Sequence, residues 1–274
     1  LLGGSTGQKA DVTGSIARAT TDARPAQPAA QGVTADGLPA AIGSQRLRNA
    51  AQAGDASAAY EVAMRFVEGR GVPASLEEAA RWYERAASKG LAPAQVRYAS
   101  MLEKGQGVRK DLAAAHKLYV AAANKGNAKA MHNLAVIYAE GAEGKPDYAS
   151  AAQWFRKAAE YGVADSQFNL GVLAARGLGT EKNIAESYKW FALAAAQGDR
   201  DAGRKRDEIA AHLDPQALAA AQQAVKSFVA QSQPAEATVV REPQGGWERT
   251  TPPPHEKPRA PGSLSFNVFD PGKL

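Results

Sequence analysis

The chain has 274 residues, a net charge of +5 and no cysteine, so disulfide bonds and thiol chemistry are excluded. Its charged residues are dispersed, and no basic stripe with interleaved aromatic residues occurs, which argues against nucleic acid as a partner. No apolar run approaches the roughly 20 residues that a membrane-spanning helix needs.

The N-terminal segment, residues 1–43, is rich in Gly, Ala, Thr and Pro and contains almost no large apolar side chain. A segment of this composition cannot offset its loss of conformational entropy by burial, so we expect residues 1–43 to form a disordered linker. The chain starts at Leu1 without a methionine, which indicates a fragment or a processed product and leaves an upstream membrane anchor open.

Between Asp55 and Gly198 the sequence repeats itself four times with a period of 36 residues. Such a period is typical of stacked supersecondary units rather than of one globular core. The blocks share a closing glycine, a glycine near the middle and an alanine pair before the closing glycine. The blocks begin at Asp55, Leu91, Asn127 and Val163 and close at Gly90, Gly126, Gly162 and Gly198.

Each block predicts two helices, which we call helix A and helix B. In the first block, apolar residues at helical spacing predict helix A from Ala56 to Glu68 and helix B from Leu76 to Lys89. One such pair cannot bury its apolar face alone, so the pairs must stack, and we predict an all-α fold, an α-solenoid of four helix pairs. A side chain that can cap free backbone amides precedes every helix B. These N-cap candidates are Ser75, Asp111, Asp147 and Asn183.

Both ends of the array are predicted to be capped. The segment from Gln45 to Ala53 aligns with a helix B and predicts an N-terminal half-repeat. After Gly198 the pattern decays, although residues 199–212 still resemble a helix A. Asp214-Pro215 then signals a further helix to about Ala230 with a polar outer face. These bounds place the solenoid domain at residues 44–231.

Residues 232–274 are rich in proline, including three in a row at 252–254, and we expect them to form an extended, disordered tail. An apolar island at 264–269 interrupts this tail. It is either a chance cluster or a docking motif that binds a partner, or the solenoid's own groove, as an extended strand. If it is a docking motif, deleting residues 263–274 lowers the partner affinity or the melting temperature.

No catalytic arrangement is recognisable in the sequence. No two of the four histidines are spaced three or four residues apart, and the carboxylates are scattered, so we expect no metal site and no cofactor. There is no nucleophile elbow and no phosphate-binding loop. The recurring Gly-x-Gly turns follow helices rather than strands and are better explained as helix stops. We therefore predict that the protein is not an enzyme.

The A helices line the concave face of a helical-pair solenoid, and there we place the candidate binding residues. One column of helix A contains asparagine twice, and because asparagine is disfavoured inside helices, we interpret it as hydrogen bonding to a peptide or sugar amide. The alternative is that these asparagines are solvated or hold the next repeat. The neighbouring column offers aromatic faces for stacking. The candidates are Glu61, Arg97, Asn133 and Asn169 in the first column and His132 and Phe168 in the second.

The stretches from Ala130 to Leu134 and from Ser187 to Gly198, together with the turn at 177–179, are similar to Sel1-like repeats, a subclass of tetratricopeptide-like solenoids. The resemblance covers about residues 45–212. The third block departs from the pattern, because Gly-Ala-Glu-Gly at 141–144 replaces the Gly-x-Gly turn and leaves its loop geometry open.

The stretches from Lys129 to Val136 and from Ala151 to Glu160 further resemble the C-terminal part of the PodJ family of alphaproteobacterial polar localisation factors. In that family a cytoplasmic coiled-coil region precedes one membrane span, and the repeats lie in the periplasm. There they are associated with peptidoglycan binding and with placing polar structures. The resemblance therefore implies a periplasmic location, as the C-terminal part of a single-span membrane protein.

Two hypotheses about function follow. The first is a non-enzymatic binding or scaffold module of the cell envelope, which binds protein partners or peptidoglycan and acts in polar localisation. The second is a general peptide-binding adaptor of the same repeat class, either cytoplasmic or periplasmic. Retention on peptidoglycan sacculi favours the first hypothesis, and no retention favours the second.

Overall fold

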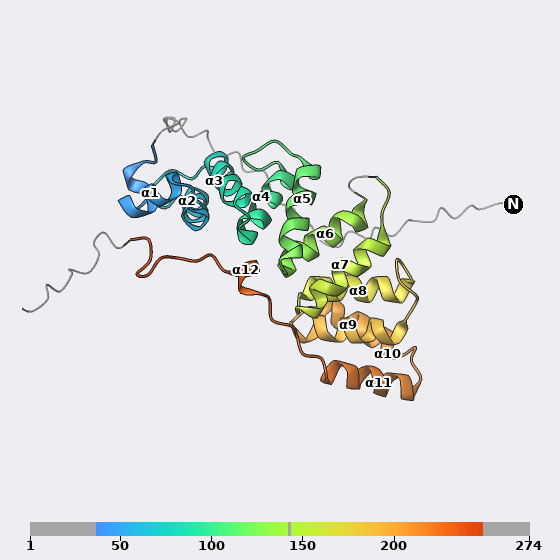
Figure 1. Ribbon diagram of the computed structural model, residues 1–274. Helices are drawn as coiled ribbons and strands as arrows, with labels where there is room; N and C mark the ends of the chain where they lie inside the picture. The colour runs from blue at the N-terminus through green and yellow to red at the C-terminus, as the bar shows by residue number, and fades with distance from the viewer. Residues whose placement is uncertain (1–36, 142–143, 249–274) are drawn as a thin grey trace, which may run out of the picture.

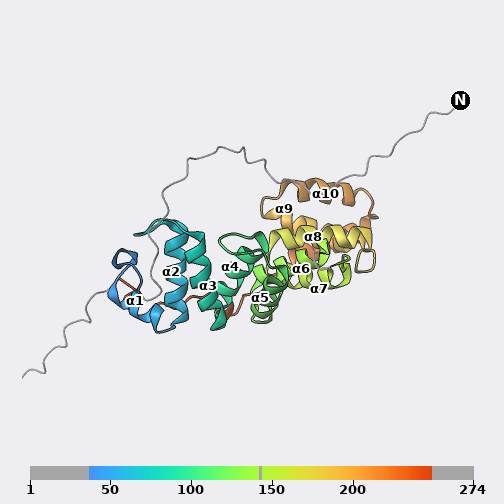
Figure 2. The same cartoon turned by 90° about the horizontal axis from the view of Figure 1, so that it is seen from above.

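The computed structural model describes residues 37–141 and 144–248, and this part of the chain contains helices, turns and coil but no strand. The helices stack side by side from one end of the molecule to the other, as predicted for an α-solenoid (Figure 1). Seen from above, the same row runs from α1 to α10 (Figure 2). The elements are η1 (Ala40–Ile42), α1 (Gln45–Gln52), α2 (Ala56–Glu68), α3 (Leu76–Ser88), α4 (Ala92–Lys104), α5 (Leu112–Asn124), α6 (Ala128–Glu140), α7 (Tyr148–Glu160), α8 (Ala164–Arg176), α9 (Ile184–Ala196), α10 (Arg200–Ala210), α11 (Pro215–Lys226) and α12 (Ala235–Thr238).

The helix bounds follow from capping chemistry. The four predicted N-caps of helix B each accept a hydrogen bond from the backbone N–H three residues on, which confirms the prediction; the Asp111 carboxylate, for example, accepts from the Ala114 N–H at 2.9 Å. Each helix A ends at a glycine in the left-handed conformation, such as Gly105 with φ of 66°. Local sequence therefore sets where every helix B begins and where every helix A of the four repeats ends.

The second glycine of the Gly-x-Gly turn has a packing role between repeats. A Cβ atom on Gly179 would lie 1.9 Å from the carbonyl oxygen of Tyr148, the first residue of α7 in the preceding repeat. A Cβ atom on Gly107 would overlap the backbone carbonyl group of Leu76 in the same way. Gly144 lies in the aberrant turn of the third repeat, and a Cβ atom added there would have no other atom within 4 Å. Gly144 therefore does not make the backbone-to-backbone contact that Gly107 and Gly179 make.

The core is a continuous stack of small and large side chains. The alanine pairs of the B helices are buried except for the partly buried Ala195, and the helix A residues Val62, Leu134 and Leu170 are also buried. Between them lie Tyr83 and its counterparts in the later B helices, Tyr119, Phe155 and Phe191. Small alanines allow neighbouring helices to approach closely while the aromatic rings fill the spaces that remain.

Both predicted caps are present. Helix α1 packs on α2 and buries Leu47 and Ala51, as expected of a half-repeat. At the other end α10 and α11 both pack against α9. The segment after α11 adds Phe228, whose ring lies edge-on to Trp190 with centroids 5.9 Å apart.

The structure corrects both expected domain boundaries. Residues 37–43 are not part of a linker: Ile42 is fully buried, and its carbonyl oxygen accepts a hydrogen bond from Arg65 at 2.7 Å. Residues 232–248 are not a free tail either, because they fold back along the array. Composition missed both segments because each docks through isolated side chains rather than through a repeated apolar pattern. Residues 1–36, the remainder of the predicted tail and its apolar island lie outside the described residues.

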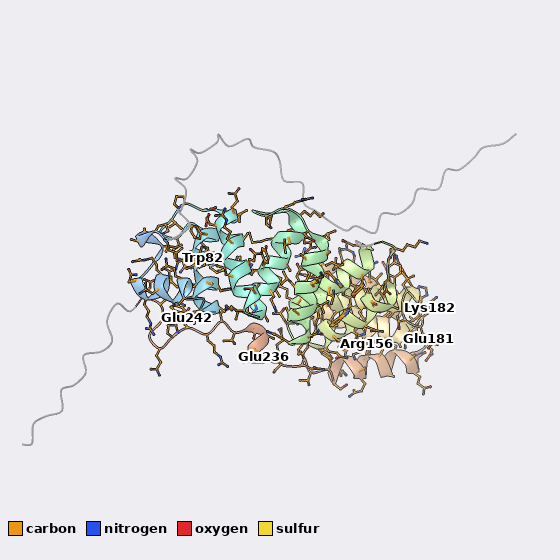
Figure 3. The ribbon with its side chains drawn as sticks, turned by 45° about the horizontal axis from the view of Figure 1, so that its top comes forward. Trp82, Arg156, Glu181, Lys182, Glu236 and Glu242 are labelled. Carbon is orange, nitrogen blue, oxygen red and sulfur yellow. The ribbon has the colours of Figure 1, made fainter. Side chains whose placement is uncertain are left out.

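We call residues 231–248 the strap. It leaves the C-terminal cap, passes α12 and returns to α1 at the opposite end of the solenoid (Figure 1). Figure 3 places Glu236, on α12, and Glu242, further along the strap, on one margin of the array. Helix α12 contacts α4, and Trp247 is buried in the same apolar cluster as Leu47. The strap thus connects the two ends of the array.

Candidate ligand-binding groove

A groove that A-helix residues line has a volume of about 690 Å³ and lies over α2 and α4. The end of α6 and the strap form its far side. We call it the A-helix groove. Its lining residues include Tyr60, Met64, Val67, Glu68, Leu76, Tyr83, Val96, Arg97, Ser100, Met101, Lys104, Asn127, Lys129, Gln233 and Thr238.

The floor of the A-helix groove is apolar and aromatic. Tyr60 and Tyr83 meet edge-on with ring centroids 5.3 Å apart. Tyr83 is buried, and this burial raises the pKa of its hydroxyl well above the usual value, so the phenol is neutral at physiological pH. At the rim, Val67 and Leu76 are 41% and 46% exposed. Exposed apolar side chains beside an apolar floor are typical of a surface that binds a partner.

The charge of the A-helix groove is predominantly positive. Arg97, Lys104 and Lys129 line it together with a single carboxylate, Glu68. Interaction with the Tyr60 side chain raises the pKa of the Arg97 guanidinium, so Arg97 stays positively charged beside the aromatic floor. The groove therefore favours a ligand that combines apolar groups with negative charge.

The first predicted column does not act as one surface. Arg97 lines the A-helix groove, but Glu61 pairs with Arg65 at 2.8 Å and with Arg70 at 3.2 Å and does not line it. Asn133 lies beside the hydroxyl of Tyr119, which donates to Glu103 at 2.8 Å. Asn169 is half-buried on α8.

The two candidates of the second predicted column also lie in different places. His132 lies between repeats, where its Nδ1 is 2.8 Å from the Ser166 hydroxyl and its ring is 5.7 Å from that of Phe155. Burial lowers the pKa of His132. Phe168 packs edge-on against Phe191, with centroids 5.4 Å apart, and lines a second groove.

This second groove lies between α8 and α10 and has a volume of about 500 Å³. Its floor is apolar, and charged residues of both signs on α10 surround it. Because the two grooves contain different members of the predicted columns, the structure does not bring the six candidates into one site. The residues that line the second groove include Phe168, Val172, Phe191, Arg204, Lys205, Glu208 and Ile209.

Several lining residues were not among the predicted candidates. Tyr60 and Val96 belong to the same column as His132 and Phe168, so the repeat alignment contained the signal for them. Lys104 lies at the C-terminal end of α4 and Lys129 in the first turn of α6, in different repeats. Gln233 and Thr238 come from the strap. No one-dimensional pattern relates these positions, because only the fold brings them together.

Over residues 37–141 and 144–248, no group of three or more His, Asp or Glu side chains is placed to hold a metal ion. No helix in this part of the chain has the length and apolarity needed to cross a membrane. The polar residues that line the A-helix groove are suited to hydrogen bonding and charge pairing.

Known proteins share both the repeat and its stacking. Residues 56–91, 92–127, 128–162 and 164–199 each match the Sel1 repeat. The structure is similar to that of c5321, a protective antigen present in uropathogenic Escherichia coli strains, with a TM-score of 0.57 and 27% identity over 65% of this chain and 39% of that chain. It is also similar to a Sel1 repeat protein from Oxalobacter formigenes, with a TM-score of 0.55 and 26% identity over 65% of this chain and 75% of that chain.

This chain therefore spans about two fifths of the length of the E. coli antigen. No curated protein sequence matches it. The matched repeats follow one another almost without a gap and coincide with the helix pairs from α2 to α9. The chain belongs to the Sel1 repeat family, whose scaffold-type fold generally mediates protein–protein interaction.

Proposed function

We propose that this chain is a non-enzymatic scaffold module that binds an extended segment of a protein partner in the A-helix groove. The observation that carries the proposal is the composition of this groove. It combines an apolar floor of Tyr60, Tyr83 and Val96 with three basic side chains and two exposed apolar residues at its rim. An extended peptide presents its side chains alternately to two sides, so one side can fill the floor while carboxylates on the other reach the basic residues.

Fluorescence anisotropy with two labelled decapeptides tests the proposal. The probe alternates leucine with glutamate, and the control peptide alternates leucine with lysine. We expect the acidic probe to bind more tightly than the basic one, and its affinity to fall as the salt concentration rises, because charge pairs at the rim are screened. Equal binding of both peptides, or binding of neither, contradicts the proposal.

A charge-reversed variant locates the binding site. Arg97→Glu combined with Lys104→Glu is expected to weaken binding of the acidic probe at least tenfold, on the order of two lost charge pairs. The matched control is Lys117→Glu combined with Lys226→Glu, which makes the same change in net charge at exposed positions on α5 and α11. If the control pair weakens binding as much as the groove pair, the probe is responding to net charge and the groove is not its site.

We further propose that the protein acts in the bacterial envelope, in the periplasm, and in polar localisation. This proposal is supported by the resemblance of residues 129–136 and 151–160 to the PodJ family. The net charge of +5 suits an anionic cell-wall polymer, so peptidoglycan is proposed as a second ligand. Sedimentation with purified sacculi tests it: retention supports peptidoglycan binding, and the absence of retention favours a peptide-binding adaptor, cytoplasmic or periplasmic. A zymogram on cell-wall material tests the proposed lack of enzymatic activity.

A further inference from the structure

The strap takes part in the A-helix groove without filling it. Gln233 and Thr238 line the groove on the side of α6, while its volume of about 690 Å³ stays open with the strap in place. The strap is therefore a wall of the groove and not a plug. A ligand in the groove would contact two side chains that come from the C-terminal end of the described chain.

The wall is attached to the solenoid at its near end. The Gln231 N–H donates to the carbonyl oxygen of Glu160 at 2.9 Å. The Gln233 side-chain oxygen accepts from the Ala128 N–H at 2.8 Å, at the start of α6. The Asn127 side-chain amide donates to the Ala237 carbonyl oxygen at 2.6 Å. These bonds satisfy backbone groups that a helix end leaves free, and they position Gln233 at the groove.

The far end of the strap is attached at the opposite end of the solenoid. Trp247 is 6% exposed and belongs to the apolar cluster of the N-terminal half-repeat. Its carbonyl oxygen accepts a hydrogen bond from the Ser44 hydroxyl. The adjacent Glu248 carboxylate pairs with Arg65, a buried arginine that also binds Glu61 and the Ile42 carbonyl.

Between these two attachments the strap is mostly exposed. Val239 is 47% exposed, and residues 241, 242, 244 and 245 are also exposed. The far attachment is imperfect as well, because the buried Trp247 Nε1 has no hydrogen-bond partner within the described structure. A buried donor without a partner reduces the net stability of docking. The strap is thus attached at both ends and exposed between them, and exposed segments with few buried contacts are those that open most readily.

We propose that the strap completes the A-helix groove, and that Trp247 is a positioning residue for it. Docking of Trp247 at the N-terminal half-repeat acts together with the near attachment to keep Gln233 and Thr238 in the wall. The proposal rests on the proposed function for its ligand, an acidic and apolar peptide. Because coupling between two sites is reciprocal, a peptide in the groove also stabilises the closed strap.

The first test needs no ligand. In Trp247→Ala we expect faster hydrogen exchange at the N–H groups of Ala237 and Val239, which donate within α12 to Pro234 and Ala235. The matched control is Val239→Ala, which shortens an exposed strap side chain and is expected to leave the exchange of Ala237 unchanged. If the protection of α12 is the same in Trp247→Ala and in the wild type, the two attachments are independent and the proposal fails.

The second test uses the acidic decapeptide. We expect Trp247→Ala to weaken its binding about tenfold, the effect of losing one or two polar contacts, although Trp247 does not line the groove. Gln233→Ala is expected to weaken binding as well, and Val239→Ala to bind as the wild type does. Tighter binding by Trp247→Ala would show that the strap obstructs the groove, and unchanged binding that it is passive; either result overturns the proposal.

The two tests separate the failure of this proposal from that of the proposed function. If the wild type binds neither peptide but Trp247→Ala still loosens α12, the ligand assignment is wrong and the coupling within the strap stands. If the wild type binds the acidic peptide and Trp247→Ala changes neither affinity nor exchange, the coupling is wrong and the groove function stands.

Discussion

His132 occupies a helix A position that the other repeats fill with Tyr60, Val96 and Phe168. It packs as those residues do, against the aromatic residue of its own helix B, here Phe155. Its imidazole also bridges to Ser166, a fully buried residue of the next repeat. A titratable group therefore lies at a position that is otherwise apolar or aromatic. The negative charge of Asp165 favours protonation of His132, and the positive charge of Lys129 opposes it.

This position predicts a pH dependence. Burial lowers the pKa of His132 in the folded state, so as the pH falls below the unfolded value of about 6.5 the unfolded chain takes up the proton first and stability declines. The stability associated with the neutral imidazole is fully present above that value. We expect the urea midpoint of the wild type to fall between pH 7.5 and 5.5 by more than that of His132→Gln, which retains a polar group but does not titrate. Parallel declines in the two proteins would contradict this.

Gly179 shows a second effect at the residue scale, a close approach between repeats. Gly179→Ala would place a Cβ atom 1.9 Å from the Tyr148 carbonyl oxygen at a φ of 66°. Gly198→Ala is the matched control, because Gly198 also has a positive φ, 101°, but no atom within 4 Å of the added Cβ. We expect both to destabilise the protein, and Gly179→Ala to cost about 1–3 kcal/mol more, the usual cost of a steric overlap. Urea denaturation measures the difference, and equal losses would show that only φ matters.

The helix is the element of this fold, and its ends depend on side-chain capping. Asn183 precedes α9, and its side-chain oxygen accepts from the Glu186 N–H at 2.8 Å. By contrast, α4 and α8 follow Leu91 and Val163, which provide no side-chain cap. Helix A of two repeats therefore relies on packing for its start, whereas every helix B of the four repeats has its own cap.

Removing one cap tests this account. We expect Asn183→Ala to lower the free energy of unfolding by about 1 kcal/mol, because the Glu186 N–H loses its partner. Asn183→Asp retains the acceptor and is expected to remain close to the wild type. Chemical denaturation followed by circular dichroism measures both. A loss in Asn183→Asp as large as that in Asn183→Ala would mean that the side chain contributes through something other than capping.

At the scale of the whole molecule, a solenoid is held together by contacts between neighbouring repeats. The strap is an exception, because it joins the C-terminal cap to the N-terminal half-repeat. The hydrogen bond from Ser44 to Trp247 connects residues 203 positions apart. Stability at the N-terminal end therefore depends on residues from the opposite end of the described chain.

Two truncations test this dependence. A chain that ends after Ala230 loses Trp247 from the N-terminal cluster, and we expect α1 to lose about 3–5 kcal/mol of protection, as for removal of a buried tryptophan. A chain that ends after Glu248 keeps the whole strap and is expected to protect α1 as the full chain does. Hydrogen exchange of the α1 amides measures the effect, with α9 as an internal reference. Equal exchange of α1 in the two truncated chains would refute the dependence.

The array itself was predictable because its determinants are local and repeated. Val62, Leu134 and Leu170 recur at one position and are all buried, and the N-caps such as Asp111 act as predicted. The candidate site was predictable only in part. Arg97 and Phe168 line grooves, but two different ones, and Lys104 and Lys129 join Arg97 only because α4 and α6 lie on one face.

The sequence alone therefore determined the family, the helix pairs and their stacking, because the residues that pack within and between repeats recur at one period. Only the tertiary structure decided which A-helix residues form the groove. It also decided that the strap joins Trp247 to Ser44, which is 203 positions away in the chain. The contacts of Trp247 and Gln233 are not repeated along the chain, so no periodicity indicates them. The free energy that docks them comes from burial and hydrogen bonding at sites that exist only after the repeats have stacked.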